Sequence, residues 1–477
     1  MNEKINKIHD ASMKILNRTG MGFHHPEILN LLKENGVRVE GETAFFTENQ
    51  ILDWVGKAKD HFKVYARNPA HDFIVGDSGG VKHIEFAPGY GAPNILERDG
   101  KVRRALLKDY IEFAKLVHQS DKFKVNGGIL VEPSDISPQN NHLVMLYHIM
   151  TLSDKFIFGI EGRKSQVDMT LDMVKILFGS QSELISKPRI MTIVNTLTPL
   201  RMDQTALDTI LAYSSHGQPV IITPGASAGF TGPITLAGLI ALSNAETLAG
   251  IAITQMVRPG TPVVYGCQST AGDMRSGAYV VGNPEHALCL KFASKLARNY
   301  GLPCRGGGAS SDAKKVSVQS GYESMMILLT CIQENINYII HSAGILDSFN
   351  CMSFDKFIID LELMGMVKRI HEDVRVDDET LALDVIHDVG VGGEYMTSAH
   401  TAKLCRQEIW SPDIGIKGPK VYENIDSAIF EKIEQKKSKM LMEYVKPQLP
   451  GDVQSELVAY LKNKGVEERF LYPQSPV

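Results

Sequence analysis

The sequence predicts an α/β protein built as an eight-stranded parallel (β/α)8 TIM barrel, with a helical segment before it and another after it. Eight short apolar runs rich in β-branched residues alternate with helix-like segments. Such alternation indicates right-handed βαβ units, and strands that are apolar throughout are covered on both faces. Eight units favour a closed barrel over an open sheet, since no phosphate-binding glycine fingerprint follows the first strand. The runs are 82–88, 124–133, 155–162, 189–199, 218–225, 261–269, 302–308 and 337–344.

The chain divides into three segments of different character. Residues 1–80 are predicted to form an N-terminal helical cap made of amphipathic helices. Residues 81–372 hold the barrel, with a β-hairpin insertion at 94–105 that turns at an Asp-Gly pair. Residues 373–477 are predicted to be a charge-mixed C-terminal helical extension with a packing or docking role.

Composition argues against several classes of function. The 477 residues are 43% hydrophobic and 22% charged, which suits a large buried core. A net charge of −5 gives no sign of a nucleic-acid surface, and no uninterrupted apolar run approaches the ~20 residues of a membrane span. The N-terminal residues lack the apolar stretch of a secretory signal, and the six cysteines are scattered without a CxxC pair. We therefore expect a cytoplasmic protein with free thiols.

The carboxyl ends of the strands, where a barrel of this kind has its active site, carry aromatic side chains beside carboxylates. Aromatic ring faces attract a quaternary ammonium, at roughly 0.5–2 kcal/mol each, and need no hydrogen bond from it. The combination predicts a pocket for an organic cation, although rings at these positions also serve to fill a barrel. The aromatic residues are Phe86, Tyr90, Phe158 and Tyr265, and the carboxylates are Glu132 and Glu161.

Two further features lie at the ends of the last two strands. The glycine run at 306–308 is followed by small residues, which leave room for a bulky group or for a partner's cofactor. A phosphate cradle is the alternative, but the P-loop pattern is absent and Asp312 adds a negative charge. His341 is either a structural histidine or an acid, a base or a hydrogen-bond donor.

Several longer segments occur in a characteristic order between about residues 84 and 365. They are LVEPSD, TLTPL, SNAETLAGIAITQMVRPGTPVVYG, GNPEHAL, GGGASSDAKKVSVQSGYE and HSAGILDSF. Through these segments the chain resembles the trimethylamine methyltransferase family, in the branch that lacks pyrrolysine. The resemblance implies a barrel enzyme that demethylates an amine and methylates the Co(I) of a corrinoid. That corrinoid is held by a small cognate partner protein, so this chain is expected to bind no cofactor tightly.

One departure from the family pattern bears on the substrate. Relatives that act on trimethylamine carry pyrrolysine close to the positions of Ala309 or Ser310, where this chain has ordinary small residues. A quaternary ammonium expels a neutral tertiary amine and needs no proton donor, whereas trimethylamine must first be activated. The expected substrate is therefore a betaine, such as glycine betaine, proline betaine, carnitine or γ-butyrobetaine. A homo-oligomer is also expected.

A betaine also carries a carboxylate, which needs a donor in the pocket. Arg305, His341 and the backbone N–H groups of the glycine run are the candidates, and His341 and Glu161 are the candidates for a catalytic role. The predicted substrate-binding residues are Phe86, Tyr90, Glu132, Phe158, Glu161, Tyr265, Arg305 and His341. The residues expected to face the corrinoid are Gly307, Gly308, Ser310, Ser311 and Asp312.

Three alternatives stay open at this point. A zinc-dependent barrel methyltransferase acting on a thiol would use cysteines such as Cys267 and Cys304, although their spacing shows no metal pattern and we expect no bound metal. A lyase or aldolase would need a Schiff-base lysine, but Lys82 and Lys124 lie near the starts of their strands. A non-catalytic protein that binds quaternary amines is the third.

Overall fold

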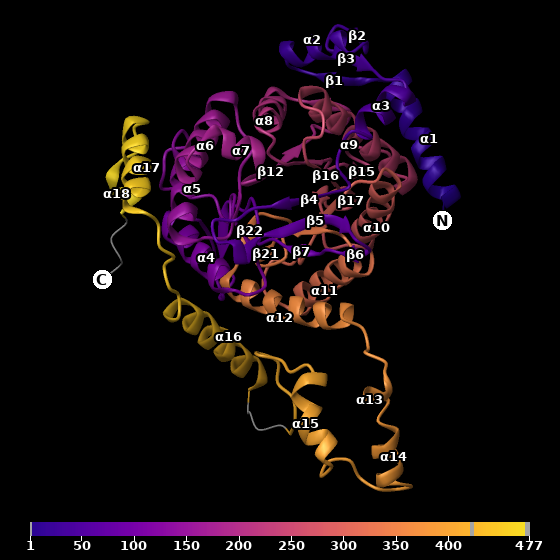
Figure 1. Cartoon of the computed structure of the whole chain (residues 1–477), viewed down its shortest axis with the longest axis vertical. Helices are drawn as coiled ribbons and strands as arrows, with labels where there is room; N and C mark the ends of the chain where they lie inside the picture. Colours follow the sequence, from indigo (N-terminus) through magenta and orange to yellow (C-terminus); the bar gives the residue numbers. More distant parts are fainter. Residues whose placement is uncertain (1, 420–423, 473–477) are drawn as a thin grey trace.

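The computed structural model describes residues 2–419 and 424–472, and a barrel of eight parallel strands lies at its centre (Figure 1). The strands follow in the order β10-β11-β12-β14-β16-β19-β20-β7, and a bridge between Phe86 and Phe123 brings the two ends of this sheet together. Every strand lies inside one of the eight predicted runs, so the barrel is confirmed. The strands are β7 (Glu85–Phe86), β10 (Val125–Gly127), β11 (Phe156–Phe158), β12 (Ile190–Asn195), β14 (Val220–Thr223), β16 (Val263–Gly266), β19 (Cys304–Gly307) and β20 (Tyr338–Ile340).

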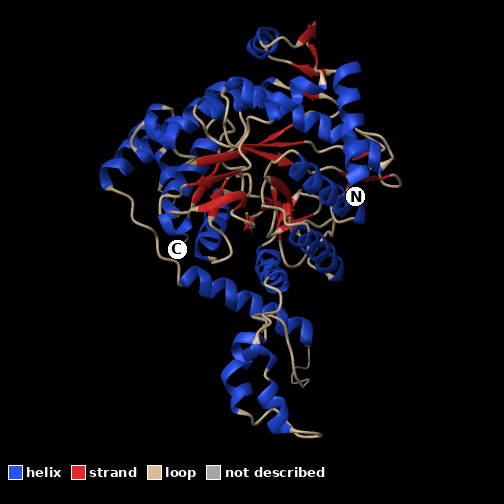
Figure 2. Cartoon of the chain, turned by 45° about the vertical axis from the view of Figure 1, so that its right-hand side comes forward, coloured by secondary structure: helices blue, strands red, loops and turns tan. Residues whose placement is uncertain are grey.

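A long helix follows each strand and covers the outside of the barrel (Figures 1 and 2). Local sequence fixes several of their ends. The helix after β16 starts where the side chain of Asn283 accepts a hydrogen bond from the N–H of His286, with Pro284 at the first position. The eight helices are α4 (Leu107–Gln119), α5 (Asn141–Leu152), α6 (Lys164–Phe178), α8 (Gln204–Ser215), α9 (Leu236–Val257), α10 (Pro284–Asn299), α11 (Val318–Gln333) and α12 (Phe354–His371). A short helix, α7 (Gln181–Ser186), lies between α6 and β12.

The lumen of the barrel holds a hydrophobic core of its own, separate from the core between the strands and the helices. Large side chains from neighbouring strands fill it, so the barrel is packed rather than hollow. The strand residues in this core are Val125, Phe156, Phe158, Met191, Ile193, Ile221, Val264, Tyr338 and Ile340.

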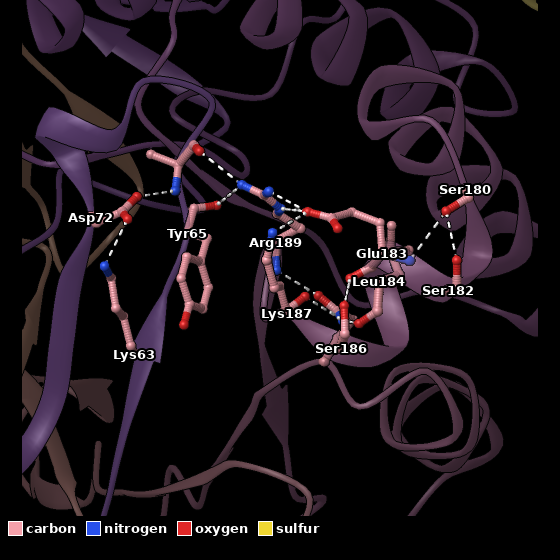
Figure 3. Close-up of polar contacts among 12 residues, drawn as sticks. Lys63, Tyr65, Asp72, Ser180, Ser182, Glu183, Leu184, Ser186, Lys187 and Arg189 are labelled. Carbon is pink, nitrogen blue, oxygen red and sulfur yellow. Dashed lines mark hydrogen bonds and ion pairs between the residues drawn. The ribbon is translucent and has the colours of Figure 1, made fainter.

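A β-hairpin from the N-terminal segment plugs the amino end of the barrel. Its strands, β4 (His61–Val64) and β5 (Phe73–Ser78), contribute four apolar residues to the lumen core, and the loop between them contributes Ala66. Arg189, just before β12, holds the hairpin by donating to the carbonyls of Tyr65 and Ala66, at 3.3 and 2.9 Å, while it pairs with Glu183 (Figure 3). With this end closed, a small molecule can enter only from the carboxyl end.

The rest of the N-terminal segment combines helices with strands, whereas the sequence predicted a helical cap. Helices α1 (Asn2–Arg18) and α3 (Glu48–Val55) pack against α9, and α2 (Pro26–Glu34) lies beside them. Strands β1 (Met21–Phe23), β2 (Arg38–Glu40) and β3 (Thr43–Phe45) form a small sheet with β13 (Arg201–Met202), and β6 (Val81–Lys82) pairs with β5. These strands are only two or three residues long, which is too short for a periodic sequence pattern to predict them.

Helix α9 is 22 residues long and, by length and composition alone, could cross a membrane. In the described residues it is a core helix, because 83% of its most apolar window is buried between the barrel and the N-terminal helices. Its polar residues, such as Glu246 and Asn244, are fully buried as well: Glu246 accepts from the N–H of Leu200 in a loop, and Asn244 donates to Ser12 on α1.

Short strands build up the rim of the barrel at the carboxyl end. The predicted hairpin is present as β8 (Asn94–Leu96) and β9 (Val102–Arg104), and it joins β21 (Ile345–Leu346) and β22 (Cys351–Met352) in one sheet. A second sheet contains β15 (Ser227–Ala228), β17 (Thr270–Asp273) and β18 (Ala278–Tyr279).

The C-terminal segment first leaves the barrel and then returns to it (Figure 1). Helices α13 (Asp378–Leu381), α14 (Leu383–Val389) and α15 (Ala399–Glu408) form a projecting arm. Helix α16 (Ile425–Met442) returns to pack on α4 and α12. Helices α17 (Gly451–Asn463) and α18 (Glu468–Leu471) then pack on α5 and α6.

Candidate functional site

Four rings meet at the carboxyl end of the barrel. The ring of Tyr90, after β7, lies edge-on to Phe158 at the end of β11, with 5.5 Å between the centroids. His341, after β20, lies 6.3 Å from Tyr90, and Phe349 covers the other side of the histidine at 4.6 Å. Tyr90 and Phe349 are only partly buried, so the cluster is reached from the mouth of the barrel. We name these four residues the aromatic cluster.

Gly128 allows this close approach. A Cβ atom there would lie 2.6 Å from the ring of Tyr90 and 2.9 Å from that of Phe158. The residue also has a φ of +65°, which glycine adopts without strain. The positions of both rings therefore depend on a glycine at the end of β10.

Phe349 is the ring of the aromatic cluster that was not predicted from the sequence. It lies on a strap between β21 and β22 in which Asp347, Ser348 and Phe349 all have left-handed backbone, with φ values of 53°, 51° and 73°. Hydrogen bonds hold this unfavourable conformation, since the N–H groups of Asp347 and Ser348 donate to the carbonyls of Ala313 and Ser311 at 3.1 Å. The only signal in the sequence was a phenylalanine eight residues after His341, within a segment that already carried the family resemblance.

Arg305, on β19, is a fully buried cation with unused hydrogen-bonding capacity. Its Nη1 donates to the carbonyl oxygen of Cys267 at 3.0 Å, but Nε and Nη2 have no partner among the described residues. Burial lowers the pKa of Arg305 to about 10, so the guanidinium stays charged at neutral pH. A buried guanidinium with two free donors is suited to receive a carboxylate.

The histidines near Arg305 are neutral. Burial, together with the charge of Arg305, holds the pKa of His341 well below its usual value, and its Nδ1 has no partner among the described residues. His286 lies against Ser269, whose carbonyl is 3.0 Å from Nδ1, and burial lowers its pKa to about 4. The Oε1 of Gln268 beside it is also unpaired among the described residues. These groups add polar capacity but no positive charge.

Glu161 supplies a carboxyl group beside the rings. Burial raises its pKa to about 7, although the side chain of Asn195 donates to it at 3.2 Å. Its charge in turn contributes to raising the pKa of Tyr90. A carboxyl group with a pKa near neutrality changes its charge readily when a cation arrives.

Three of the predicted binding residues lie away from the site formed by the aromatic cluster, Glu161 and Arg305. Phe86 belongs to the core between the strands and the helices, while its neighbour Ala87 faces the lumen. Tyr265 also faces outward, and its hydroxyl donates to Asn244 on α9 at 2.9 Å. Glu132 is exposed to solvent on the rim.

The loop after the glycine run is packed beneath other loops rather than open at the mouth. Ser310 and Ser311 are fully buried, and Ser311 donates to Glu323 at 2.6 Å. Asp312 accepts hydrogen bonds from the N–H groups of Val281 and Gly282, at 2.8 and 2.9 Å. A Cβ atom at Gly308 would collide with Ser342, and one at Gly307 would lie 2.9 Å from His286. Of the five residues expected to face a corrinoid, four are therefore buried and Asp312 is partly buried.

The described cysteines do not support the thiol-directed zinc alternative. No three His, Cys, Asp or Glu side chains among the described residues lie close enough together to hold a metal ion. Burial raises the pKa of Cys267, and that of Cys304 to about 11, so both thiols are protonated. Zinc binds the thiolate.

The fold and the site together define a (β/α)8-barrel enzyme with ring faces, a carboxyl group and a buried cation at the carboxyl end of its barrel. Residues 1–468 match the pattern of the trimethylamine methyltransferase (MTTB) family. The chain belongs to this family, and it is a methyltransferase.

Two relatives from this family are similar to the chain over most of its length, and both are named as betaine methyltransferases. The chain is 38% identical to the glycine betaine methyltransferase of Desulfitobacterium hafniense (strain Y51) over 471 residues, which covers 98% of this chain and 96% of that one. It is 31% identical to the proline betaine:corrinoid methyltransferase of Eubacterium limosum, over 84% of each chain. Among solved structures, the monomethylamine methyltransferase of Methanosarcina barkeri has a TM-score of 0.55 at 9% identity, and covers 97% of this chain and 87% of that one. This last likeness concerns the fold alone.

Proposed function

We propose that this enzyme removes a methyl group from a betaine and transfers it to Co(I) of a corrinoid bound to a partner protein in the cytoplasm. The observation that carries the proposal is the pairing of an aromatic cluster with a buried guanidinium that has two free donors. The first suits a methylated ammonium and the second a carboxylate, and a betaine has both. The similarity to a glycine betaine methyltransferase over nearly the whole chain supports glycine betaine as the first substrate to test.

The pocket would act mainly by positioning. In the proposed complex, Tyr90, Phe158 and Phe349 hold the methylammonium group while Arg305 fixes the carboxylate, so one methyl group points toward the mouth. Holding the reacting atoms in line makes the transfer effectively a reaction within one complex, so less entropy is lost on reaching the transition state. The positive charge on nitrogen disappears as the methyl group leaves, so strong ionic contacts at that nitrogen would favour the ground state. Ring faces in contact, with Glu161 at the side, avoid this penalty.

Reduced cobalt, supplied by the partner protein, is the nucleophile. The N–CH3 bond breaks while a Co–CH3 bond forms, and the electron pair of the broken bond stays on nitrogen as a neutral tertiary amine. No proton is transferred, which agrees with a site whose histidines are neutral. Because the plug closes the amino end, the partner would approach from the side where Tyr90 and Glu161 are partly exposed.

Absence of pyrrolysine supports a quaternary substrate. At the position where the relatives that act on trimethylamine carry pyrrolysine, this chain has Ala309 and Ser310. Both side chains are small and completely buried, so neither can activate a tertiary amine. A quaternary ammonium needs no such activation.

The proposal is tested by mixing the protein with a Co(I)-corrinoid protein and a panel of amines while methyl-Co(III) absorbance is followed. We expect methylation with glycine betaine or another betaine and none with trimethylamine. Methylation with trimethylamine alone would overturn the proposal. Tight betaine binding without methylation of any reduced corrinoid protein would instead indicate a binding protein.

Glu161 should make betaine binding depend on pH. A bound cation favours the ionised form, so it lowers the pKa of Glu161 from about 7 in the free enzyme. Affinity should be constant well above pH 7 and weaken by up to about tenfold per pH unit below it, because the ligand must then displace a proton. His341 does not contribute, since its pKa is well below this range.

Calorimetric titration with glycine betaine across this range measures the effect directly. Glu161→Gln is the matched control, because the amide keeps the shape of the side chain but cannot titrate. Its affinity should be flat with pH. An unchanged pH profile in Glu161→Gln would assign the titration to another group.

A further inference from the structure

The arm formed by residues 373–411 has no core of its own. None of its helices α13, α14 and α15 has a buried residue. They contain four, seven and ten residues, fewer than the ~12–15 that an isolated helix needs to be stable in water. Figures 1 and 2 both show the arm projecting away from the barrel. Such helices require a surface to pack on.

The arm also exposes an unusual number of large apolar side chains. Val391 and Met396 are essentially fully exposed, and Leu383 is 68% exposed. Exposed apolar residues clustered in this way mark an interaction surface. The others are Val374, Val376, Leu381, Ile386, Tyr395 and Ile409.

The base of the arm, in contrast, is held firmly in one position. The carboxylate of Glu362 on α12 accepts hydrogen bonds from three successive N–H groups at residues 413–415, at 2.7, 2.7 and 3.0 Å. The indole of Trp410 lies against Gly365 on the same helix. These contacts with α12 therefore fix the direction in which the arm leaves the barrel.

Charge is divided between the outer part of the arm and its base. Residues 383–394, which form α14 and the turn after it, carry three carboxylates and no lysine or arginine. A groove of about 590 Å³ at the base is lined by four cations and one carboxylate, Glu372, with Trp410 and Ile409 as apolar walls. The cations are Lys122, Lys368, Arg369 and Arg406. Lys122 is paired with Asp121 at 3.0 Å, whereas Lys368 and Arg406 form no ion pair within the described residues. An acidic apolar tip and a basic apolar groove on one chain are complementary to each other.

We propose that the arm packs on a second copy of this chain, with the acidic tip of one copy in the basic groove of the other. Helix α14 lies at the far end of the arm, away from α12, which supplies Lys368 and Arg369 to the groove (Figure 1), so the contact must form between molecules. The groove lies beside Lys122, which precedes β10 at the amino end of the barrel. Assembly there leaves the carboxyl end free. A contact of this kind, repeated by two-fold symmetry, buries both tips at once.

Sedimentation velocity of the full chain tests the proposal. The wild-type protein should sediment with at least twice its monomer mass of 52.6 kDa. The Leu383→Glu/Ile386→Glu variant should sediment as a monomer, because both side chains are exposed in one copy and become covered in the assembly. Val318→Glu is the matched control, since this valine is 86% exposed on α11, and it should leave the assembly intact.

Reversing the charges on both sides of the contact distinguishes it from non-specific hydrophobic association of the arm. Lys368→Glu/Arg406→Glu should dissociate the assembly, and adding Asp384→Lys/Asp388→Lys to the same chain should restore it. A monomeric wild-type protein, or an assembly that persists in Leu383→Glu/Ile386→Glu, would overturn the proposal. Neither result bears on methyl transfer, which has its own assay.

Discussion

Replacing Arg305 with methionine should weaken the binding of glycine betaine on the order of 100-fold. Arg305 is the fully buried cation with two free donors, and a betaine carboxylate is expected to take both. Removing one partner of a buried, hydrogen-bonded charge pair costs about 3 kcal/mol, which corresponds to the stated loss of affinity. The change is measured as the dissociation constant, and as KM in the methyl-transfer assay.

Tetramethylammonium shows whether the loss is specific to the carboxylate. It carries the same cationic group but no anion, so Arg305→Met should leave its affinity unchanged within a few fold. The preference for betaine over tetramethylammonium would then collapse. If the variant weakened both ligands equally, Arg305 would be shaping the pocket rather than receiving the carboxylate.

The same substitution should not destabilise the protein. In the free enzyme, Arg305 buries two unpaired donors, each of which costs about 1–3 kcal/mol. Methionine of similar length fills the space without them, so the thermal midpoint should stay constant or rise. A large fall in the midpoint together with loss of binding would indicate a structural role.

Sequence patterns located the eight barrel strands and their active ends but not the direction of each side chain. Strands covered on both faces are apolar throughout, so the alternation that separates inside from outside is missing. Phe86 and Ala87 illustrate the ambiguity, because the alanine faces the lumen and the phenylalanine faces the helices. A shift of one residue exchanges the two faces. Tyr265, which turns outward to Asn244, was assigned to the pocket for the same reason.

Contacts between segments that are far apart in the sequence could not be predicted from sequence patterns either. The hairpin of β4 and β5 has apolar residues that a pattern detects, but its place in the amino end of the barrel depends on Tyr65 donating to Pro188 at 2.9 Å. Phe349 reaches His341 only because three consecutive residues adopt left-handed backbone. No composition rule predicts such a turn in residues other than glycine or asparagine. Arg305, by contrast, was a candidate from the sequence, because a betaine carboxylate needs a hydrogen-bond donor in the pocket.

Replacing Lys356 with methionine should destabilise the protein by about 4 kcal/mol, because it leaves Asp360 buried without its partner. Both side chains are completely buried on α12, and Lys356 Nζ lies 2.5 Å from the carboxylate. The pair also joins two loops of the active site, since Lys356 donates to the carbonyl of Ala309 and Asp360 accepts from the N–H of Gly344. The thermal midpoint should fall by about 4 °C.

The double variant Lys356→Met/Asp360→Leu is the control, and it should recover more than half of the loss because it buries no charge. The pH dependence separates the two variants further. Burial raises the pKa of Asp360 above its unfolded value even beside Lys356, and loss of that cation raises it again. A raised carboxyl pKa stabilises the folded state at low pH and loses that stabilisation as pH rises through the folded value. Lys356→Met should therefore regain stability on moderate acidification, whereas the double variant should not. Equal pH profiles for the two would mean that Asp360 is not left as a buried charge.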